Sequence, residues 1–410
     1  MTKSFISLAI RQQGHKTWHL AWPVIVANLS LPLLNLADVT ILGHLDSSVY
    51  LAAIAAGSSL FAYIFWGFNF LQMGLSGFTS QAYGRKDISE IFSLLKRYSA
   101  VALALIVAVL LLHRPMIAFG LALVDPPAEV ATEAQIYLQI RMLGVPAIVL
   151  NSMLLGFFVG LQNTRISLYS ISLTQVLNIA LNLFFVFGLD YAIKGIALGT
   201  VISEYSGLAL ILWQLRRTLI RLKPAQHRPA RVQWHWSAYR PIFQVSSNLF
   251  IRSFALLSSF VWFNRMMADA GSTELAANAL LLSFFTLISG VLDGTAAAAE
   301  AQTGQGMGRS DSNYLKQIWL VSGLMNLMFM IGLSLFLLLA GSTLVELMSN
   351  QEDIITTAIK LMPLIALLPI TGGIAFWLDG ICVGARQSLA MRNSVLIGFF
   401  LCRYLIRIFF

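Results

Sequence analysis

The chain has 410 residues, of which 58% are hydrophobic and only 11% are charged. Soluble proteins carry roughly 45–50% apolar and about 25% charged residues, so this chain has too few charges to cover a surface that faces water. The composition therefore excludes a soluble protein. The net charge of +9 is better explained by an asymmetry between membrane loops than by binding to nucleic acid, and we expect no nucleic-acid partner.

Eleven apolar segments are long enough to cross a bilayer, which takes about 20 residues of helix. They are continuous runs without the alternation of a membrane β-strand, which predicts an all-α polytopic bundle. The predicted spans lie near residues 19–42, 49–79, 98–124, 135–161, 166–188, 191–213, 242–264, 275–299, 316–340, 357–384 and 390–410.

Lysine and arginine are concentrated on one side of these spans. That side holds the N-terminus and the long segment 214–240, whereas the opposite loops hold few basic residues and most of the loop acids. The positive-inside rule places the N-terminus and the long segment in the cytoplasm. We expect an N-terminal lobe over 1–215 with helices 1–6, a basic cytoplasmic linker over 216–240 and a C-terminal lobe over 241–410. A contact between the linker and anionic lipids is the lesser alternative.

The second half of the chain matches the first half in register, at one constant offset. Residues 51–55 match 275–279, residues 81–87 match 305–311, and Gly156 and Gly160 match Gly380 and Gly384. Three matches at one offset favour a duplication. Six spans per repeat give two parallel repeats related by a pseudo-twofold axis along the membrane normal. Residue 410 then corresponds to residue 186, at the end of the fifth span. The repeat therefore predicts a twelfth helix that this chain lacks, as in a truncated or frame-shifted chain.

Asp38 is the most informative of the carboxylates within spans, because each such group has to offset a cost of roughly 2.5–3.5 kcal/mol. Its span has no Lys or Arg, and Asn35 lies three residues earlier on the same helix face. A lone buried carboxyl group disfavours its charged form, which suits a group that binds and releases a proton. A permanently neutral, hydrogen-bonded aspartate is the alternative. Pro23 and Pro32 allow the same helix to bend.

Other polar side chains within the spans form a second group of candidates. Asn178 and Asn182 are four residues apart on one helix face. Together with Thr200 and Asp38 they could form one polar pocket, although ordinary hydrogen bonds between helices are the safer interpretation. For Glu204, Asp293 and Asp379, a structural hydrogen bond and a place in a polar cavity are both open.

Enzyme and metal motifs are absent from the sequence. It has no HExxH, GxSxG or P-loop pattern, and its six histidines lie in loops or at span ends. The two cysteines show no partner pattern. We therefore expect no enzymatic activity, no metal and no cofactor.

The ordered set of short motifs resembles the multidrug and toxic compound extrusion (MATE) family, and most closely its DinF (DNA-damage-inducible) branch. The resemblance covers nearly the whole chain, and no single motif carries it. The motifs are residues 22–28 with Pro32, 36–38, 43–46, 82–85, 161–165, 197–204, 378–380 and 391–394.

The resemblance implies twelve helices in two six-helix lobes and efflux of organic cations and other amphipaths in exchange for a cation. The cation site of the family falls on Asp38, Asn178, Asn182 and Thr200. The position of Asn182 is commonly aspartate in the family, and an amide carries neither a proton nor a full negative charge. The glutamate that some members have in the seventh helix also has no counterpart in this sequence. Both departures favour a proton over sodium as the coupling ion.

We therefore expect a monomeric, proton-coupled antiporter of the bacterial inner membrane, with small amphipathic, cationic substrates and membrane lipids as its partners. The first alternative is a flippase for lipids or lipid-linked oligosaccharides. Such proteins tend to line their cleft with basic residues, for which only Arg141 and Arg252 are candidates. An intramembrane lipid-modifying enzyme ranks third. The sequence leaves the identity of the substrates open.

Overall fold

The computed structural model describes the backbone of residues 2–43, 48–222 and 235–409, with side chains described outside residues 2–9, 31–43, 48, 64 and 405–409. Every regular element in these ranges is a helix. The elements are α1 (Thr2–Gly43), α2 (Ser48–Trp66), η1 (Gly67–Asn69), α3 (Phe70–Gly84), α4 (Ile88–Val124), α5 (Ala128–Met142), α6 (Val145–Gly160), α7 (Arg165–Leu183), η2 (Phe184–Gly188), α8 (Ala192–Leu222), α9 (Trp236–Ala270), α10 (Ser272–Arg309), α11 (Ser312–Met348), α12 (Glu352–Gly384) and α13 (Ser388–Phe409).

The predicted spans follow these helices in order, and two of the spans comprise more than one element. The second span is formed by α2, η1 and α3 in succession, and the fourth by α5 and α6, which are bent by 52° at their junction. Among the described residues, eight helices are long and apolar enough to cross a membrane, and a ninth if the bent pair is counted as one span. The chain is a multi-pass membrane protein.

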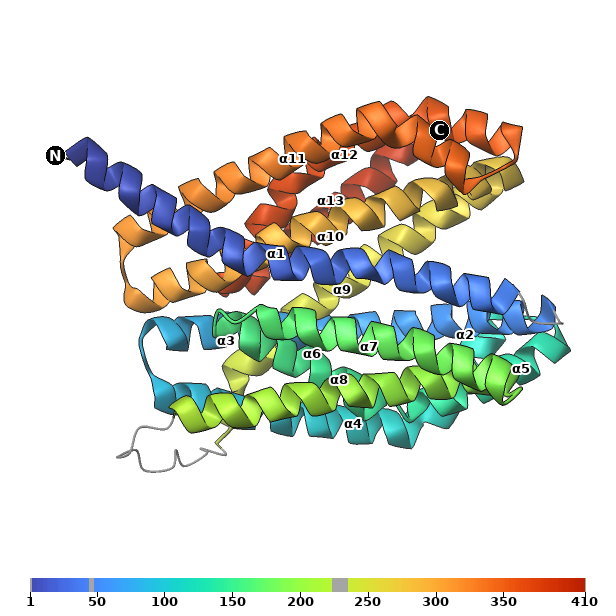
Figure 1. Ribbon diagram of the computed structural model, residues 1–410, viewed down its shortest axis with the longest axis horizontal. Helices are drawn as coiled ribbons and strands as arrows, with labels where there is room; N and C mark the ends of the chain where they lie inside the picture. The colour runs from blue at the N-terminus through green and yellow to red at the C-terminus, as the bar shows by residue number, and fades with distance from the viewer. Residues whose placement is uncertain (1, 44–47, 223–234, 410) are drawn as a thin grey trace.

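The helices form two bundles (Figure 1). One bundle contains α2 to α8, and the other contains α9 to α13. Helix α1 runs between the two bundles and packs against α10 on one side and α7 on the other. The predicted linker, residues 216–240, covers the end of α8, the start of α9 and residues 223–234 between them, which lie outside the described residues.

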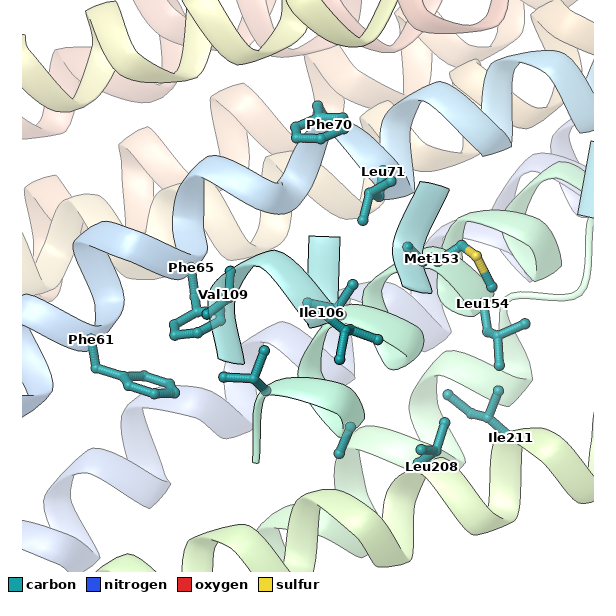
Figure 2. Packing of buried hydrophobic residues seen from close by; sticks show 14 of the residues in the cluster. Phe61, Phe65, Phe70, Leu71, Ile106, Val109, Met153, Leu154, Leu208 and Ile211 are labelled. Carbon is teal, nitrogen blue, oxygen red and sulfur yellow. The ribbon is translucent and has the colours of Figure 1, made fainter. Parts of the chain in front are cut away.

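A large apolar core fills the first bundle. Side chains from α2, α3, α4, α6 and α8 meet there, and Leu71 and Ile211 are fully buried. Figure 2 shows Phe61, Phe65 and Val109 on one side of this core and Met153, Leu154 and Leu208 on the other. Because lipid tails are as apolar as these side chains, the core is stabilised by close van der Waals packing, and these contacts fix the helices that carry the polar site.

The structure repeats at the offset that the sequence indicates. The Asp87 side chain caps α4 by accepting from the Glu90 amide, and Asp311 caps α11 by accepting from the Tyr314 amide. Lys86 and Ser310, at equivalent positions, have positive φ angles of 59° and 55°. Equal cap chemistry at equal backbone geometry in both halves confirms two parallel repeats.

Candidate functional site

Asn178, Asn182 and Thr200 form a continuous run of hydrogen bonds between α7 and α8. The Asn182 amide donates to Asn178 Oδ1 over 3.0 Å, and the Asn178 amide donates to Thr200 Oγ1 over 2.9 Å. The Thr200 hydroxyl in turn donates to the Ile196 carbonyl over 2.8 Å. Both asparagines are buried, with 2% and 0% of their surface exposed. The structure thus brings three of the four predicted site residues together in a polar but uncharged strip.

Close approach of the two helices depends on Gly199 of α8. A Cβ at this position would collide with the side-chain oxygen of Asn182. One turn before Asn178, the buried Gln175 has a side-chain nitrogen for which the described residues provide no acceptor. A buried amide in this state favours a water molecule or a polar ligand beside it.

The aspartate of the predicted site lies on α1, and α1 packs against α7. The side chains of Asn35, Asp38 and Pro32 lie outside the described residues, and only the path of their backbone is defined. The helix continues without interruption through Pro23 and Pro32. The predicted bending of α1 therefore concerns a second conformation, because α1 is unbroken in this one.

Glu204 lies apart from this strip and forms an ion pair with Arg141 of α5. The distance from Arg141 Nη1 to Glu204 Oε1 is 2.8 Å, and the two side chains are only 8% and 13% exposed. The guanidinium also stacks over Phe61 at 4.2 Å from the ring centroid. Because each charge has its partner inside the first bundle, the pair ties α5 to α8, as one of the two interpretations of Glu204 predicts.

Asp379 and Asp293, the predicted polar residues of the second bundle, are grouped around Arg252 of α9. Asp379 of α12 forms an ion pair with Arg252, and a third of its side chain is exposed. Asp293 of α10 is exposed and lies within electrostatic reach of the same guanidinium. Two carboxylates therefore share one arginine, and the cluster has an excess negative charge when both are ionised.

The two bundles meet tightly at the end of the molecule that holds the N-terminal part of α1. Gly84 faces the backbone carbonyl of Gln305, and Gly308 faces that of Gln81, with no space for a Cβ at either position. The side-chain amide of Gln81 also donates to the backbone carbonyl of Gly384 over 2.8 Å. Gly84 and Gly308 occupy equivalent positions in the two repeats, as do Gln81 and Gln305. The two glycine contacts are therefore the same contact seen from either side of the pseudo-twofold axis.

Side-chain hydrogen bonds close the same end. Lys16 donates to Gln305 Oε1 over 2.8 Å, and the Gln162 amide donates to the same oxygen over 3.0 Å. Thr17 donates to Gln302 Oε1 over 3.0 Å. These hydrogen bonds join residues of α1, of the turn after α6 and of α10 in one network. We call the end of the molecule that holds this network and the two glycine contacts the closed end.

The sequence shows the charges within the spans but not their pairing. The cost of an unpaired intramembrane charge requires that Arg141 and Arg252 have acidic partners. Several acids within the spans were available, and only the packing of α5 on α8 and of α9 near α12 selects Glu204 and Asp379. The described residues contain no group of three His, Cys, Asp or Glu side chains that could hold a metal ion.

Comparison with known proteins identifies the family. The MatE family model matches residues 23–184 and again 249–409, one match in each half. DNA damage-inducible protein F of Escherichia coli is 33% identical over 92% of this chain and 82% of its own length. Protein DETOXIFICATION 44, chloroplastic, of Arabidopsis thaliana is 25% identical over 94% of this chain and 75% of its own length. A probable multidrug resistance protein NorM of Photorhabdus laumondii is 24% identical over 93% of this chain and 84% of its own length.

Solved structures share the fold. A MATE crystallised in complex with MaD3S superposes with a TM-score of 0.82 at 19% identity, covering 94% of this chain and 86% of the other. The Vibrio cholerae MATE transporter VcmN in its bent form gives a TM-score of 0.82 at 17% identity, covering 96% and 89%. With two family matches across most of the chain and the two-lobe helical bundle of these structures, the chain belongs to the MatE family of membrane transporters.

Proposed function

We propose that this protein is a secondary antiporter that exports amphipathic, cationic compounds across a bacterial inner membrane in exchange for protons. The observation that carries the proposal is the uncharged run Asn182–Asn178–Thr200, which begins on α7, the helix that packs against the one bearing Asp38, and ends on α8. Relatives named as multidrug resistance and multidrug export proteins support the substrate class.

The choice of the proton as coupling ion rests on charge. Hard cations such as sodium need several oxygen ligands and enough negative charge to offset the loss of their hydration. Asn178, Asn182 and Thr200 supply oxygens without charge, and their hydrogens are largely engaged with one another or with the Ile196 carbonyl. Asp38 would be the single anion of the pocket. A proton needs only that one group.

Transport then follows from competition at Asp38. Protonation from outside removes the charge of Asp38 and allows α1, with its two prolines, to bend. The first-half cavity shrinks and releases the substrate, and a new substrate binds from inside once the proton has left. Coupling requires that protonation of Asp38 and the substrate-loaded state exclude each other.

The flippase alternative loses its main argument in this structure. Its two candidate basic residues, Arg141 and Arg252, are both engaged with carboxylates, Glu204 and Asp379. A phosphate entering the bundles would have to compete with these ion pairs. Neither guanidinium is therefore a free anion-binding group.

Efflux of ethidium from proteoliposomes with an imposed proton gradient tests the proposal. We expect Asp38→Asn to reduce gradient-driven efflux to the level of protein-free vesicles, while the protein still inserts and elutes as a single species. Asp269→Asn is the matched control, because Asp269 is an exposed acid at the end of α9. Efflux by Asp38→Asn at more than half the rate of the unmodified protein would rule the assignment out.

A further inference from the structure

A second, basic cavity lies near the closed end, away from the polar residues assigned to transport. It has a volume of about 330 Å³ and is lined by residues of α3, α4, α9 and the turn between α12 and α13. Three arginines face it, Arg85, Arg97 and Arg386, against the single carboxylate of Glu90. This excess of positive charge in a defined cavity is the starting point of the inference.

Arg97 and Arg386 are held in place and are only partly neutralised. Arg97 lies 3.6 Å from Glu90, its side chain is 11% exposed, and its buried Nε atom has no acceptor among the described residues. Arg386 stacks over Phe78 at 4.8 Å from the ring centroid. Burial and the neighbouring Arg85 guanidinium lower the pKa of Arg386, which lies in the turn outside the spans. An anion between Arg85 and Arg386 would remove this repulsion.

The first turn of α9 lines the cavity and also favours a bound anion. Ser237 and Ala238 line the cavity, and α9 begins at Trp236 without a side-chain cap at its N-terminus. The first amides of a helix and the positive end of its dipole favour an anion. Guanidinium groups supply paired N–H donors that match the oxygens of a phosphate.

The cavity joins the two halves of the molecule. Arg85, Glu90 and Arg97 belong to the first repeat, whereas Ser237 and Arg386 belong to the second. Contacts of α3 with α9 and α12 bring these walls together. A conformation in which this end opens would pull Arg85 and Arg386 apart, so a ligand between them would favour the closed arrangement.

We propose that this cavity binds a phosphate group, from an anionic phospholipid head group or from free phosphate, and that the bound group holds the two repeats together at the closed end. The guanidinium groups of Arg85, Arg97 and Arg386 and the N-terminus of α9 contact its oxygens. The site is independent of the coupling residues and does not require the proposed transport reaction.

Thermal unfolding of the purified protein in uncharged detergent tests the site. One arm titrates inorganic phosphate against sodium chloride at equal ionic strength, and the other adds dioleoylphosphatidylglycerol or dioleoylphosphatidylcholine. We expect the unfolding midpoint to rise by several degrees with phosphate, phosphatidylglycerol or both. A response to phosphate alone identifies free phosphate as the ligand, and a response to phosphatidylglycerol alone identifies the lipid head group.

The repeat supplies the matched control. Arg309 is the counterpart of Arg85 in the second repeat, near the same end, and stacks on Tyr314 outside the cavity. We expect Arg85→Gln and Arg386→Gln each to raise the half-saturating concentration at least tenfold, and Arg309→Gln to respond like the unmodified protein. Because the readout is the ligand-induced shift, a lower starting midpoint in a variant does not obscure it.

Three results would overturn the proposal. They are no rise with either probe, an unchanged response in both Arg85→Gln and Arg386→Gln, and an equal loss in Arg309→Gln. The last result would show that general surface charge, rather than the cavity, attracts the anion.

Discussion

The two intramembrane ion pairs differ in what surrounds them. In the first bundle, Arg141 and Glu204 form a pair of one cation and one anion with both side chains almost fully buried. In the second bundle, Arg252 pairs with the partly exposed Asp379 and also lies near the exposed Asp293. The first pair is neutral and buried, whereas the second group has a second carboxyl group, that of Asp293, at an exposed position.

The comparison shows that the duplication preserved the helices and their packing but not their charges. In the alignment of the two repeats, Arg252 corresponds to Asn28 and Asp379 corresponds to Leu155. The glycine contacts at the closed end, by contrast, recur in both halves. Backbone approach is therefore common to the repeats, and each half has its own polar chemistry.

The largest expected effect is on the buried ion pair of Arg141 and Glu204. Glu204→Gln leaves the Arg141 charge buried without a counter-charge, which costs about 3–5 kcal/mol in the free energy of unfolding. Adding Arg141→Gln should restore part of this loss, because two neutral amides replace the pair. Denaturant titration in mixed micelles measures both values. A loss below about 1 kcal/mol in Glu204→Gln would show that water reaches the pair.

The next effect concerns the contact that the repeats share. Gly84→Ala and Gly308→Ala each push a methyl group against a backbone carbonyl of the other bundle, an overpacking that costs about 1–3 kcal/mol. Because the two contacts are related by the pseudo-twofold axis, we expect equal losses of thermal stability. Gly332→Ala is the control, since a Cβ there meets no atom within 4 Å. Unequal effects would show that the closed end is less symmetric than its backbone.

A smaller effect is expected on the binding of cations, and it tests the carboxyl group of Asp293 in the second bundle. Removing one charge near a bound cation weakens binding by about 1 kcal/mol at a partly solvated site, or roughly fivefold. We expect Asp293→Asn to raise the dissociation constant of ethidium by this factor and to leave stability nearly unchanged. Binding of an uncharged amphipathic dye is the internal control. Equal weakening of both dyes would point to a change of shape instead of charge.

The pH dependence of the closed end tests a single titrating group. Lys16, which precedes the first predicted span, has its pKa lowered from 10.5 to about 8 by burial and by the nearby Arg309. Between these pH values the folded state binds fewer protons than the unfolded state, so stability rises with pH across this window. The gain is complete above 10.5 and absent below about 8.

Thermal midpoints recorded between about pH 7.5 and 10 test this dependence. We expect a rise in the unmodified protein and a smaller rise in Lys16→Met. Lys360→Met, at an exposed position of α12, should behave like the unmodified protein. If Lys16→Met keeps the full slope, Lys16 is not the group that titrates.

Much of the fold could be predicted from the sequence, because membrane spans follow from the length of apolar runs. The repeat also matched the segments that hold Gly84 and Gly308, although their contact across the two bundles is known only from the structure. What the sequence did not provide was the short 3-10 turn η1 between α2 and α3 and the 52° bend between α5 and α6. Such local departures from a regular α-helix depend on packing against neighbouring helices, which one sequence does not report.

The site was predictable to a lesser degree. The spacing of Asn178 and Asn182 predicted a shared helix face, and the structure joins them by a hydrogen bond. The link to Thr200 was left open by the spacing, because residues on different helices have no fixed spacing, and the family resemblance favoured it. The basic cavity was not predicted, since Arg85, Arg97 and Arg386 are distant in sequence and each resembles an ordinary positive-inside residue.

The central claim is that one carboxylate in a neutral polar pocket couples transport to protons. Ethidium efflux from proteoliposomes tests it most directly. One set of vesicles has a proton gradient, and the other has a sodium gradient with the same pH on both sides. We expect the proton gradient to drive efflux and the sodium gradient to add little, with both responses absent in Asp38→Asn. Strong stimulation by sodium alone that is lost in Asp38→Asn would contradict the account, because it would show that the amide oxygens of Asn178 and Asn182 suffice as sodium ligands beside a single anion.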